Sequence, residues 1–419
     1  MTLGANRWIR RKWPTALPAL TLAVAVTVPA VIASATASGA STKPYQLTNG
    51  LPAGAKLLDV GGLTPRSAFG GHVAHGIPNL DSIPNFSGHF NVKGLNGSGQ
   101  TQNQWLTNFV GALPQHGGTT TIGAPVIPVT VQLLDSSGDA SLSSSASQYE
   151  SNVLNSPVFS PGTWSSSPTP TELPDAIQRA EFFKPAKADW HTELAPEQTS
   201  SLVVQIPYGD YYYQLNGDGT CCAFILVDAN TFDNQFFDTI VEAINAGTIT
   251  TRDISTFLFP NTYLYLGTPS VCCVLGFHSY VFNDLPSGVE QRWVLNYSSW
   301  ISPGLYPGGL QDVTALSHEM AETFADPFVV SDGIHGLTPW WLSPNGNCQD
   351  DLEVGDVIEG LPDGVYPVTL HGFLYHPQNV ALAQWFATGQ PSDALDGAFS
   401  YPDESVLTSP ATFQNVNCS

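Results

Sequence analysis

The sequence LSHEMAETFADP, at residues 316–327, contains the pattern His-Glu-x-x-Glu and predicts the central helix of the fold. Residues four apart lie on one face of a helix, so His318 and Glu322 are placed to bind one metal ion together. Glu319 stands one step round the helix, at the position of a general base for a water activated by that ion. The sequence therefore predicts a metal site on this helix, with Glu319 as the catalytic residue.

Residues on either side of the pattern give the predicted helix its limits and its buried face. Asp312 is a typical N-cap residue, and Asp326-Pro327 ends the helix. The apolar stripe consists of Val313, Leu316, Met320 and Phe324. His318 and Glu322 project from the opposite side, so we expect them to face a cleft. The alternative is a solvent-exposed pair, which contributes only about 0.2–0.5 kcal/mol and needs no function.

Residues 1–40 have the features of a secretory signal peptide. Four basic residues precede an apolar run at 16–33, and small residues follow it. A retained membrane anchor is the alternative, because the run is close to the shortest length that spans a bilayer. We expect a secreted, extracellular protein with no membrane association once the signal peptide is removed.

The composition excludes some classes of partner. The chain has 13 Lys and Arg against 35 Asp and Glu, a formal net charge of −22. Nucleic acid and anionic membrane surfaces are repelled by such a chain. We therefore expect no nucleic-acid partner.

Six cysteines suit an exported, disulfide-containing protein. They are Cys221, Cys222, Cys272, Cys273, Cys348 and Cys418. An even count in an oxidising compartment favours disulfides, and a zinc–cysteine site is the alternative, although no Cys-x-x-Cys spacing occurs. Neighbouring residues on a strand point to opposite faces, so each doublet should direct one sulfur inward. We expect a bond between the two doublets.

The order of expected elements indicates one folded domain after a loose segment. Residues 41–80 are rich in Gly, Pro and Ser and suit an extended arm or propeptide, and 81–419 form the domain. An amphipathic helix at 231–246 ends at Gly247. Strands are predicted at 122–134, 202–207, 211–215, 221–227, 263–266, 272–282 and 292–297, and further helices at 148–154 and 175–183. This order predicts an α+β domain in which a mixed sheet backs the metal-site helix.

Several short motifs resemble a known group of proteins. Residues 316–322 and 325–327, with Glu-Val-Gly-Asp at 353–356, resemble the pattern of secreted bacterial zincin-like proteins, which are similar to the plant EXORDIUM or phosphate-induced protein family. Asn-Ser-Pro-Val-Phe at 155–159 and Gly-Phe-His at 276–278 resemble the same group. The resemblance implies a zincin-like fold, with an edge strand lining the substrate cleft.

A metal site needs a third protein ligand. Phe328 stands where a metzincin has its third histidine, which excludes that arrangement. Glu353 and Asp356, in the acidic segment 349–356, are the candidates, and the alternatives for this segment are a separate calcium site and a solvated run of charges. Asp326 lies a further turn along the same helix face, but a role at the helix end beside Pro327 is favoured for it. His278, on a strand leading toward the site, and His335 are less favoured ligand candidates, because most isolated histidines are structural or solvated.

The ligand types favour particular metals. One imidazole and two carboxylates form a mixed nitrogen and oxygen set, for which zinc is favoured. Manganese and calcium are the alternatives, because carboxylates suit both ions.

These residues predict a secreted metal-dependent hydrolase, a zinc metallopeptidase acting on a peptide or protein substrate. The first alternative is a non-enzymatic extracellular protein of EXORDIUM type, associated with cell wall or matrix. The second is a carbohydrate-active protein, in which Trp340-Trp341 and Tyr211-Tyr212-Tyr213 stack on a cell-wall glycan. Core packing is the commoner explanation for such aromatic clusters.

Overall fold

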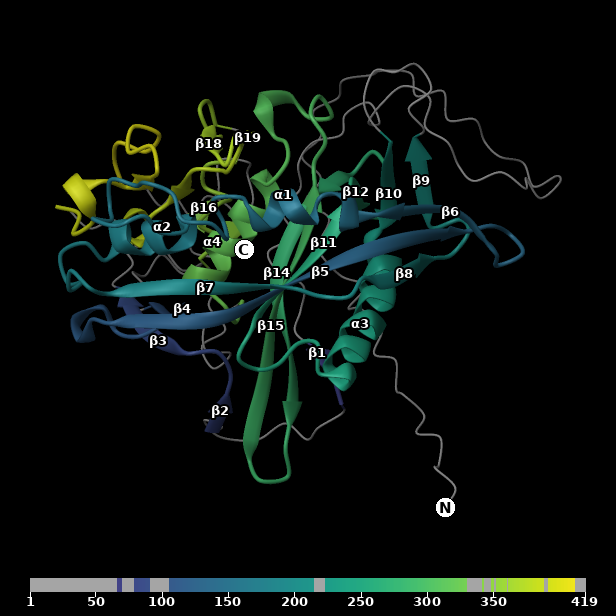
Figure 1. Ribbon diagram of the computed structural model, residues 1–419, viewed down its shortest axis with the longest axis horizontal. Helices are drawn as coiled ribbons and strands as arrows, with labels where there is room; N and C mark the ends of the chain where they lie inside the picture. Colours follow the sequence, from purple (N-terminus) through teal and green to yellow (C-terminus); the bar gives the residue numbers. More distant parts are fainter. Residues whose placement is uncertain are drawn as a thin grey trace, which may run out of the picture. The chain divides into compact units, whose positions relative to one another are not determined.

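A nine-stranded sheet forms the largest element of the fold (Figure 1). The computed structural model describes residues 66–69, 79–90, 105–214, 223–329, 341–342, 348–349, 352–359, 361–387 and 391–410. All of them lie in one compact unit, Thr42–Ser419. Residues 1–40, predicted to be a signal peptide, lie outside the described residues. No helix in these ranges is long and apolar enough to cross a membrane.

The large sheet is mixed, with parallel pairing at its centre. Its strands are β1 (Arg66–Ser67), β2 (Asn79–Asp81), β5 (Thr119–Leu134), β6 (Ala140–Ser145), β7 (His191–Gln198), β8 (Leu202–Ile206), β11 (Ile254–Pro260), β14 (Gly276–Asp284) and β15 (Val289–Trp300). Strand β11 pairs in parallel with both β5 and β15, whereas β14 and β15 form a long antiparallel hairpin. The result is a mixed α/β protein with a parallel central sheet and few helices, which is compatible with the predicted α+β class.

Smaller sheets flank the large one. A four-stranded sheet contains β9 (Tyr211–Gln214), β10 (Phe224–Asp228), β12 (Thr262–Tyr265) and β13 (Cys272–Val274). Two-stranded pairs are β3 (Asn85–Phe90) with β4 (Trp105–Val110), β16 (Trp341–Leu342) with β17 (Cys348–Gln349), β18 (Val368–Leu370) with β19 (Phe373–Tyr375), and β20 (Val380–Ala381) with β21 (Ser400–Tyr401). The predicted single strand at 272–282 is therefore two strands, β13 and β14, that belong to different sheets.

The helices are few and mostly short. The α-helices are α1 (Glu150–Leu154), α2 (Leu173–Glu181), α3 (Ala229–Ala246), α4 (Thr314–Ala325) and α5 (Ala383–Phe386), and the 3₁₀ turns are η1 (Pro114–His116), η2 (Ala146–Gln148), η3 (Pro307–Gly309) and η4 (Leu395–Gly397). Helix α3 begins where the Asp228 carboxylate accepts the amides of Asn230 and Thr231, and it ends at Gly247 with a φ of 71°. The predicted helix and its stop at this glycine are confirmed.

The segment 41–80, expected to be an extended arm, contributes strand pairing to the large sheet. Arg66 lies opposite Val281, so β1 extends the sheet beside β14. Strand β2, at the start of the expected domain, pairs with β15. Backbone hydrogen bonds thus tie this part of the chain to the hairpin formed by β14 and β15.

Tyrosines at 211–213 belong to the core rather than to an open aromatic platform. Tyr211 is fully buried and its hydroxyl donates to the carbonyl of Leu134 at 2.8 Å. Tyr212 packs edge-on against Tyr265 at 5.8 Å between ring centroids. This arrangement favours the packing interpretation of the cluster. Trp340 and the side chain of Trp341 lie outside the described residues.

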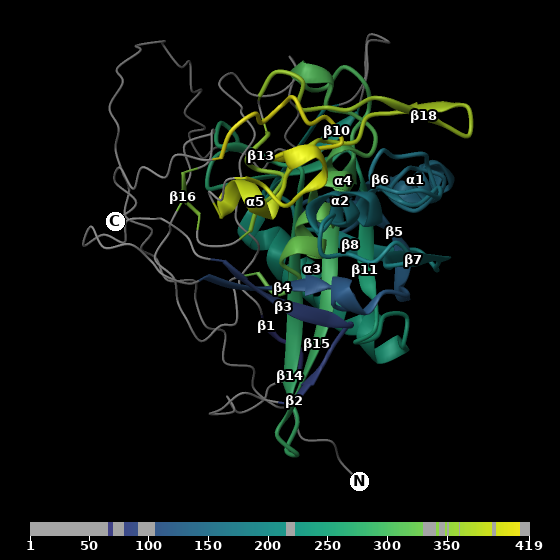
Figure 2. The ribbon, with the colours of Figure 1, turned by 90° about the vertical axis from the view of Figure 1, so that its left-hand side faces the viewer.

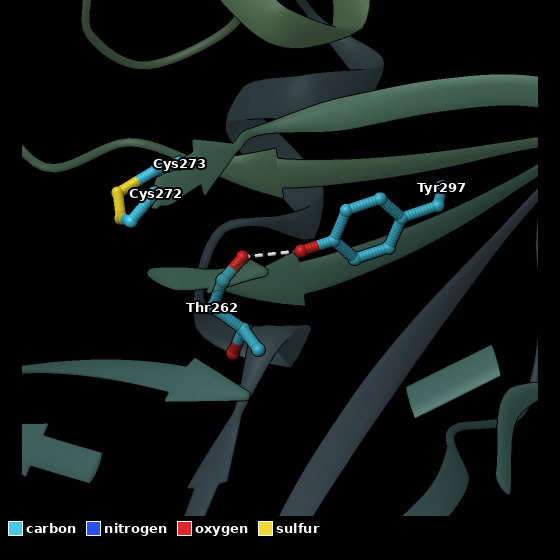
Figure 3. The surroundings of a disulfide bond; sticks show 4 residues. All are labelled: Thr262, Cys272, Cys273 and Tyr297. Carbon is cyan, nitrogen blue, oxygen red and sulfur yellow. Dashed lines mark hydrogen bonds between the residues drawn. A yellow bond between two sulfur atoms is a disulfide. The ribbon is translucent and has the colours of Figure 1, made fainter. Parts of the chain in front are cut away.

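The second cysteine doublet differs from its predicted arrangement. Both Cys272 and Cys273 are buried, and Figure 3 draws a bond between their sulfur atoms, beside the hydrogen bond that Tyr297 donates to the Thr262 carbonyl. The predicted bond between the two doublets stays a prediction, because the first doublet lies outside the described residues. Cys221, Cys222, Cys418 and the side chain of Cys348 lie outside the described residues.

Candidate metal centre

Helix α4 is buried on every side, which rules out a solvent-exposed His-Glu pair. All its residues from Thr314 to Ala325 are buried. Leu316, Met320 and Phe324 pack with apolar residues of the large sheet, as the stripe predicted. Ala321 and Ala325, on another side, belong to a different apolar cluster. The side of the helix expected to face a cleft is therefore covered by other parts of the chain.

The C-terminal end of α4 is held by polar contacts from neighbouring elements. Thr107 donates to the Ala325 carbonyl at 2.9 Å, and Gln178 of α2 donates to the Phe324 carbonyl at 3.3 Å. Figures 1 and 2 both show α2 next to α4. Asp312 does not cap the helix, contrary to the prediction, because its carboxylate accepts the His376 amide at 2.9 Å and contacts that imidazole.

The predicted ligand His318 contacts the second predicted ligand, Glu322, and one candidate third ligand, Asp356. Its Nε2 atom lies 3.0 Å from Glu322 Oε1 and 3.3 Å from Asp356 Oδ1. Asp356 comes from the segment 352–359, which crosses the polar side of α4. The backbone amide of Gly355 donates to Glu322 Oε1 at 3.0 Å, so the same carboxylate oxygen fixes this segment against the helix.

His278, a less favoured ligand candidate from the sequence, lies within the centre. It projects from β14, and its Nδ1 atom lies 3.5 Å from Glu322 Oε2, 3.7 Å from Glu319 Oε2 and 3.8 Å from Glu353 Oε2. The side chain is only 1% exposed. Sequence reasoning ranked it low because no spacing links a strand residue to a helix motif; the signals were its predicted strand, which leads toward the site, and the resemblance at 276–278.

Outer hydrogen bonds set the tautomer of both imidazoles. His278 Nε2 donates to the Asp326 carbonyl at 3.2 Å, so Nδ1 is the nitrogen that faces the carboxylates. Gln378 donates its amide to the Gly355 carbonyl at 2.7 Å, so its oxygen is the acceptor for His318 Nδ1 at 3.1 Å. Nε2 of His318 therefore faces the carboxylates, to which it donates when the ring is charged; the neutral ring would offer the same nitrogen to a metal ion. Metal-binding histidines are oriented in this way, with the other ring nitrogen donating to a carbonyl or carboxylate.

Two glycines allow the side chains to approach this closely. A Cβ atom on Gly355 would lie 2.6 Å from Cγ of His318, and one on Gly276 would lie 2.6 Å from Glu319 Oε1. Neither distance is compatible with a larger residue unless the imidazole or the carboxylate moves. The glycines therefore set the positions of His318 and Glu319.

Burial and mutual contact shift the pKa values of the central carboxylates and imidazoles. Burial raises the pKa of Glu319 to about 7, although the charges of the imidazoles oppose the change. Burial also opposes ionisation of Glu322, but His318 and His278 outweigh it and hold the pKa of Glu322 well below its usual range. Burial disfavours the charged form of His278, yet hydrogen bonds and charges from Glu319 and Glu322 raise its pKa to about 10. The carboxylates thus favour the positively charged form of the imidazoles that lie between them.

The donor set fits a metal ion. The side chains form two groups, and within each group the ligand atoms lie within 4.8 Å of one another. One group is His278, Glu322 and Glu353, and the other is His318, Glu319 and Glu322. Buried imidazole and carboxylate ligands of this kind suit zinc, manganese or iron. The structure therefore brings together all five predicted site residues, His318, Glu319, Glu322, Glu353 and Asp356, and it adds His278. His335 lies outside the described residues, and Asp326 takes part through its carbonyl.

Comparisons with known proteins place the chain in no family. No family model, curated protein or solved structure matches it.

Proposed function

We propose that the protein is a secreted, zincin-like, metal-dependent hydrolase that cleaves peptide bonds, with zinc as the favoured metal. The observation that supports this most is the position of Glu319, a carboxylate next to two imidazoles whose free nitrogens face further carboxylates. We assign His318, Glu322 and Asp356 as ligands for the ion. Glu353 is the alternative third ligand, because it contacts the same centre from the side of His278.

The roles of the side chains follow from their charge and position. A bound divalent ion supplies a Lewis acid that polarises a carbonyl group and makes a water molecule more acidic. Glu319, with its pKa raised by burial to about 7, would act as the base that takes a proton from water and later passes it to the leaving amine. His318 Nε2 would hold the ion while Gln378 keeps its ring in place, and the Asp326 carbonyl orients His278 beside Glu319 and Glu322.

A second candidate function is a non-enzymatic extracellular protein in which the metal supports the fold. The close burial of the centre favours this alternative, because His318, the most exposed of its residues, is only 9% exposed. Structural metal sites are closed by protein ligands, whereas catalytic sites keep one position open. The two functions differ in whether removal of the metal abolishes a reaction or only lowers stability.

Metal analysis combined with a peptidase assay separates these functions. We expect the purified protein to contain stoichiometric divalent metal, and to cleave an unfolded protein substrate in a manner abolished by chelation and restored by zinc. His318→Ala should lower the metal content and abolish cleavage, whereas His191→Asn is the matched control, since His191 is also buried and paired with a carboxylate. Bound metal without metal-dependent cleavage would favour the structural alternative. A protein that contains no metal, even after zinc is supplied, would contradict both the hydrolase and the structural-metal function.

A further inference from the structure

We infer that the centre holds two divalent cations, one beside His318 and one beside His278, bridged by the carboxylate of Glu322. The inference deepens the proposed function and rests on its premise that the centre binds divalent metal. It concerns the number of ions and their separate ligands, which neither the sequence motif nor the expected zincin pattern provides.

The two oxygens of Glu322 face different imidazoles. Oε1 lies 3.0 Å from His318 Nε2, and Oε2 lies 3.5 Å from His278 Nδ1. A carboxylate that offers one oxygen to each of two nitrogen ligands has the arrangement of a bridge between two ions. Two-metal sites in general place their ions about 3.5–4 Å apart, a separation that a bridging carboxylate can span.

Each imidazole also has a carboxylate of its own. Asp356 lies 3.3 Å from His318, whereas Glu353 lies 3.8 Å from His278. His318 and His278 come from different elements, α4 and β14, and each is oriented by its own hydrogen-bond acceptor. Asp356 and Glu353 therefore belong to different sets, which share Glu322. Glu319 lies within reach of both imidazoles, and its role as the base is the one given in the proposed function.

Charge balance favours two ions over one. Metal binding requires ionised carboxylates and neutral imidazoles, so Glu319, Glu322, Glu353 and Asp356 together carry four negative charges. All four side chains are buried, and buried charges are stable only when they are compensated nearby. One divalent ion would offset two of these four charges and two ions would offset all four, beside the other contacts that Glu353 and Asp356 make.

Metal titration of matched variants tests the number of ions. Metal-free full-length protein is titrated with Zn²⁺ and, separately, with Mn²⁺, and bound metal is measured after removal of free ions. We expect two equivalents in the wild type. Glu353→Gln and Asp356→Asn form a matched, nearly isosteric pair, and each should leave one ion bound normally while the other binds tenfold to a hundredfold more weakly. Glu322→Gln should weaken both ions.

Electron paramagnetic resonance of the Mn²⁺ form supplies a readout that does not depend on activity. Two neighbouring ions couple, so the signal of the second equivalent should differ from that of the first, and Glu353→Gln should restore the spectrum of an isolated ion. A wild-type plateau at one equivalent would overturn the two-ion inference and leave the hydrolase proposal standing. Loss of the same single ion in both variants would also overturn the two-ion inference alone. A wild type that binds no ion would overturn the two-ion inference and the hydrolase proposal together.

Discussion

Two buried clusters of this protein place histidine against carboxylate, and they differ in the balance of donors and acceptors. In the first, the single carboxylate of Asp175 accepts the Thr192 amide at 2.7 Å, the Thr171 hydroxyl at 2.7 Å and the His191 ring at 2.8 Å. Three donors thus satisfy one acid, which sits at the start of α2. Nothing in this cluster requires a further charge.

The metal centre has the opposite balance. Four carboxylates surround two imidazoles, and both rings present a free nitrogen to the acids. A histidine–carboxylate contact by itself therefore does not identify a functional site. The excess of buried carboxylates over basic side chains does, because buried negative charge is stable only with positive charge nearby. Variants of both clusters, taken in order of decreasing effect, test whether this difference separates a site from a structural cluster.

Glu319→Gln should lower peptide cleavage by about 10²–10⁴-fold, because the amide keeps the shape of the side chain but cannot accept a proton. Metal content should stay at the wild-type level, as measured by elemental analysis. His191→Asn, in the first cluster, should change cleavage little. Full activity in the Glu319→Gln protein would remove Glu319 from the mechanism.

Removal of divalent metal should lower the stability of the folded protein by about 4 kcal/mol if metal is present at a thousand times its dissociation constant. The reason is that the ion binds only the folded centre, where four buried carboxylates otherwise repel one another. Thermal unfolding with chelator and with added zinc measures the effect. Identical melting temperatures under both conditions would contradict the assignment of these residues as a metal centre.

Asp175→Ala should destabilise the protein by roughly 3 kcal/mol, because it leaves buried donors from Thr171, His191 and Thr192 without their acceptor. Urea unfolding measures the loss. Metal content should not change, since the first cluster contributes no ligand. A loss of bound metal in the folded variant would show that the two clusters are coupled.

Gly355→Ala should weaken metal binding by about tenfold to a hundredfold, because the new methyl group displaces the ring of His318. Competition with a chromogenic chelator measures the affinity. Gly276→Ala provides the contrast, since its methyl group meets Glu319 and should reduce cleavage more than it reduces metal binding. Equal losses of metal in both variants would argue against separate roles for His318 and Glu319.

Glu181→Gln should flatten the dependence of stability on pH, by at most about 1.4 kcal/mol per pH unit. Burial raises the pKa of Glu181 in α2 to about 8, against 4.5 for the unfolded chain. Between these values the folded protein keeps a proton that the unfolded chain releases, so wild-type stability falls as pH rises. Urea unfolding of both proteins from pH 5 to 8 measures the difference. Parallel profiles would show that Glu181 ionises freely when folded.

Much of the local structure was predictable from the sequence. The i, i+4 spacing of His318 and Glu322 and the apolar stripe through Met320 predicted the metal-site helix, and α3 with its stop at Gly247 was predicted almost to the residue. The antiparallel pairing of β9 with β10 also agrees with the expected hairpin. These features depend on side chains close together in the sequence, where helical and strand periodicity apply directly.

The sequence by itself determined the helix motif, the acidic segment with Glu353 and Asp356, and the alternation of strands before them. Only the tertiary structure decided that His278 belongs to the centre, because the pairing of β14 with β15 beneath α4 brings that residue to the helix. The tertiary structure also decided that the polar side of α4 is covered. Leu352 and Val354 pack in one buried cluster with Ala321, which places the acidic segment against the helix. The physical reason is sequence separation. Periodic patterns report on residues that are close in the sequence, whereas burial and charge compensation depend on which distant segments pack together.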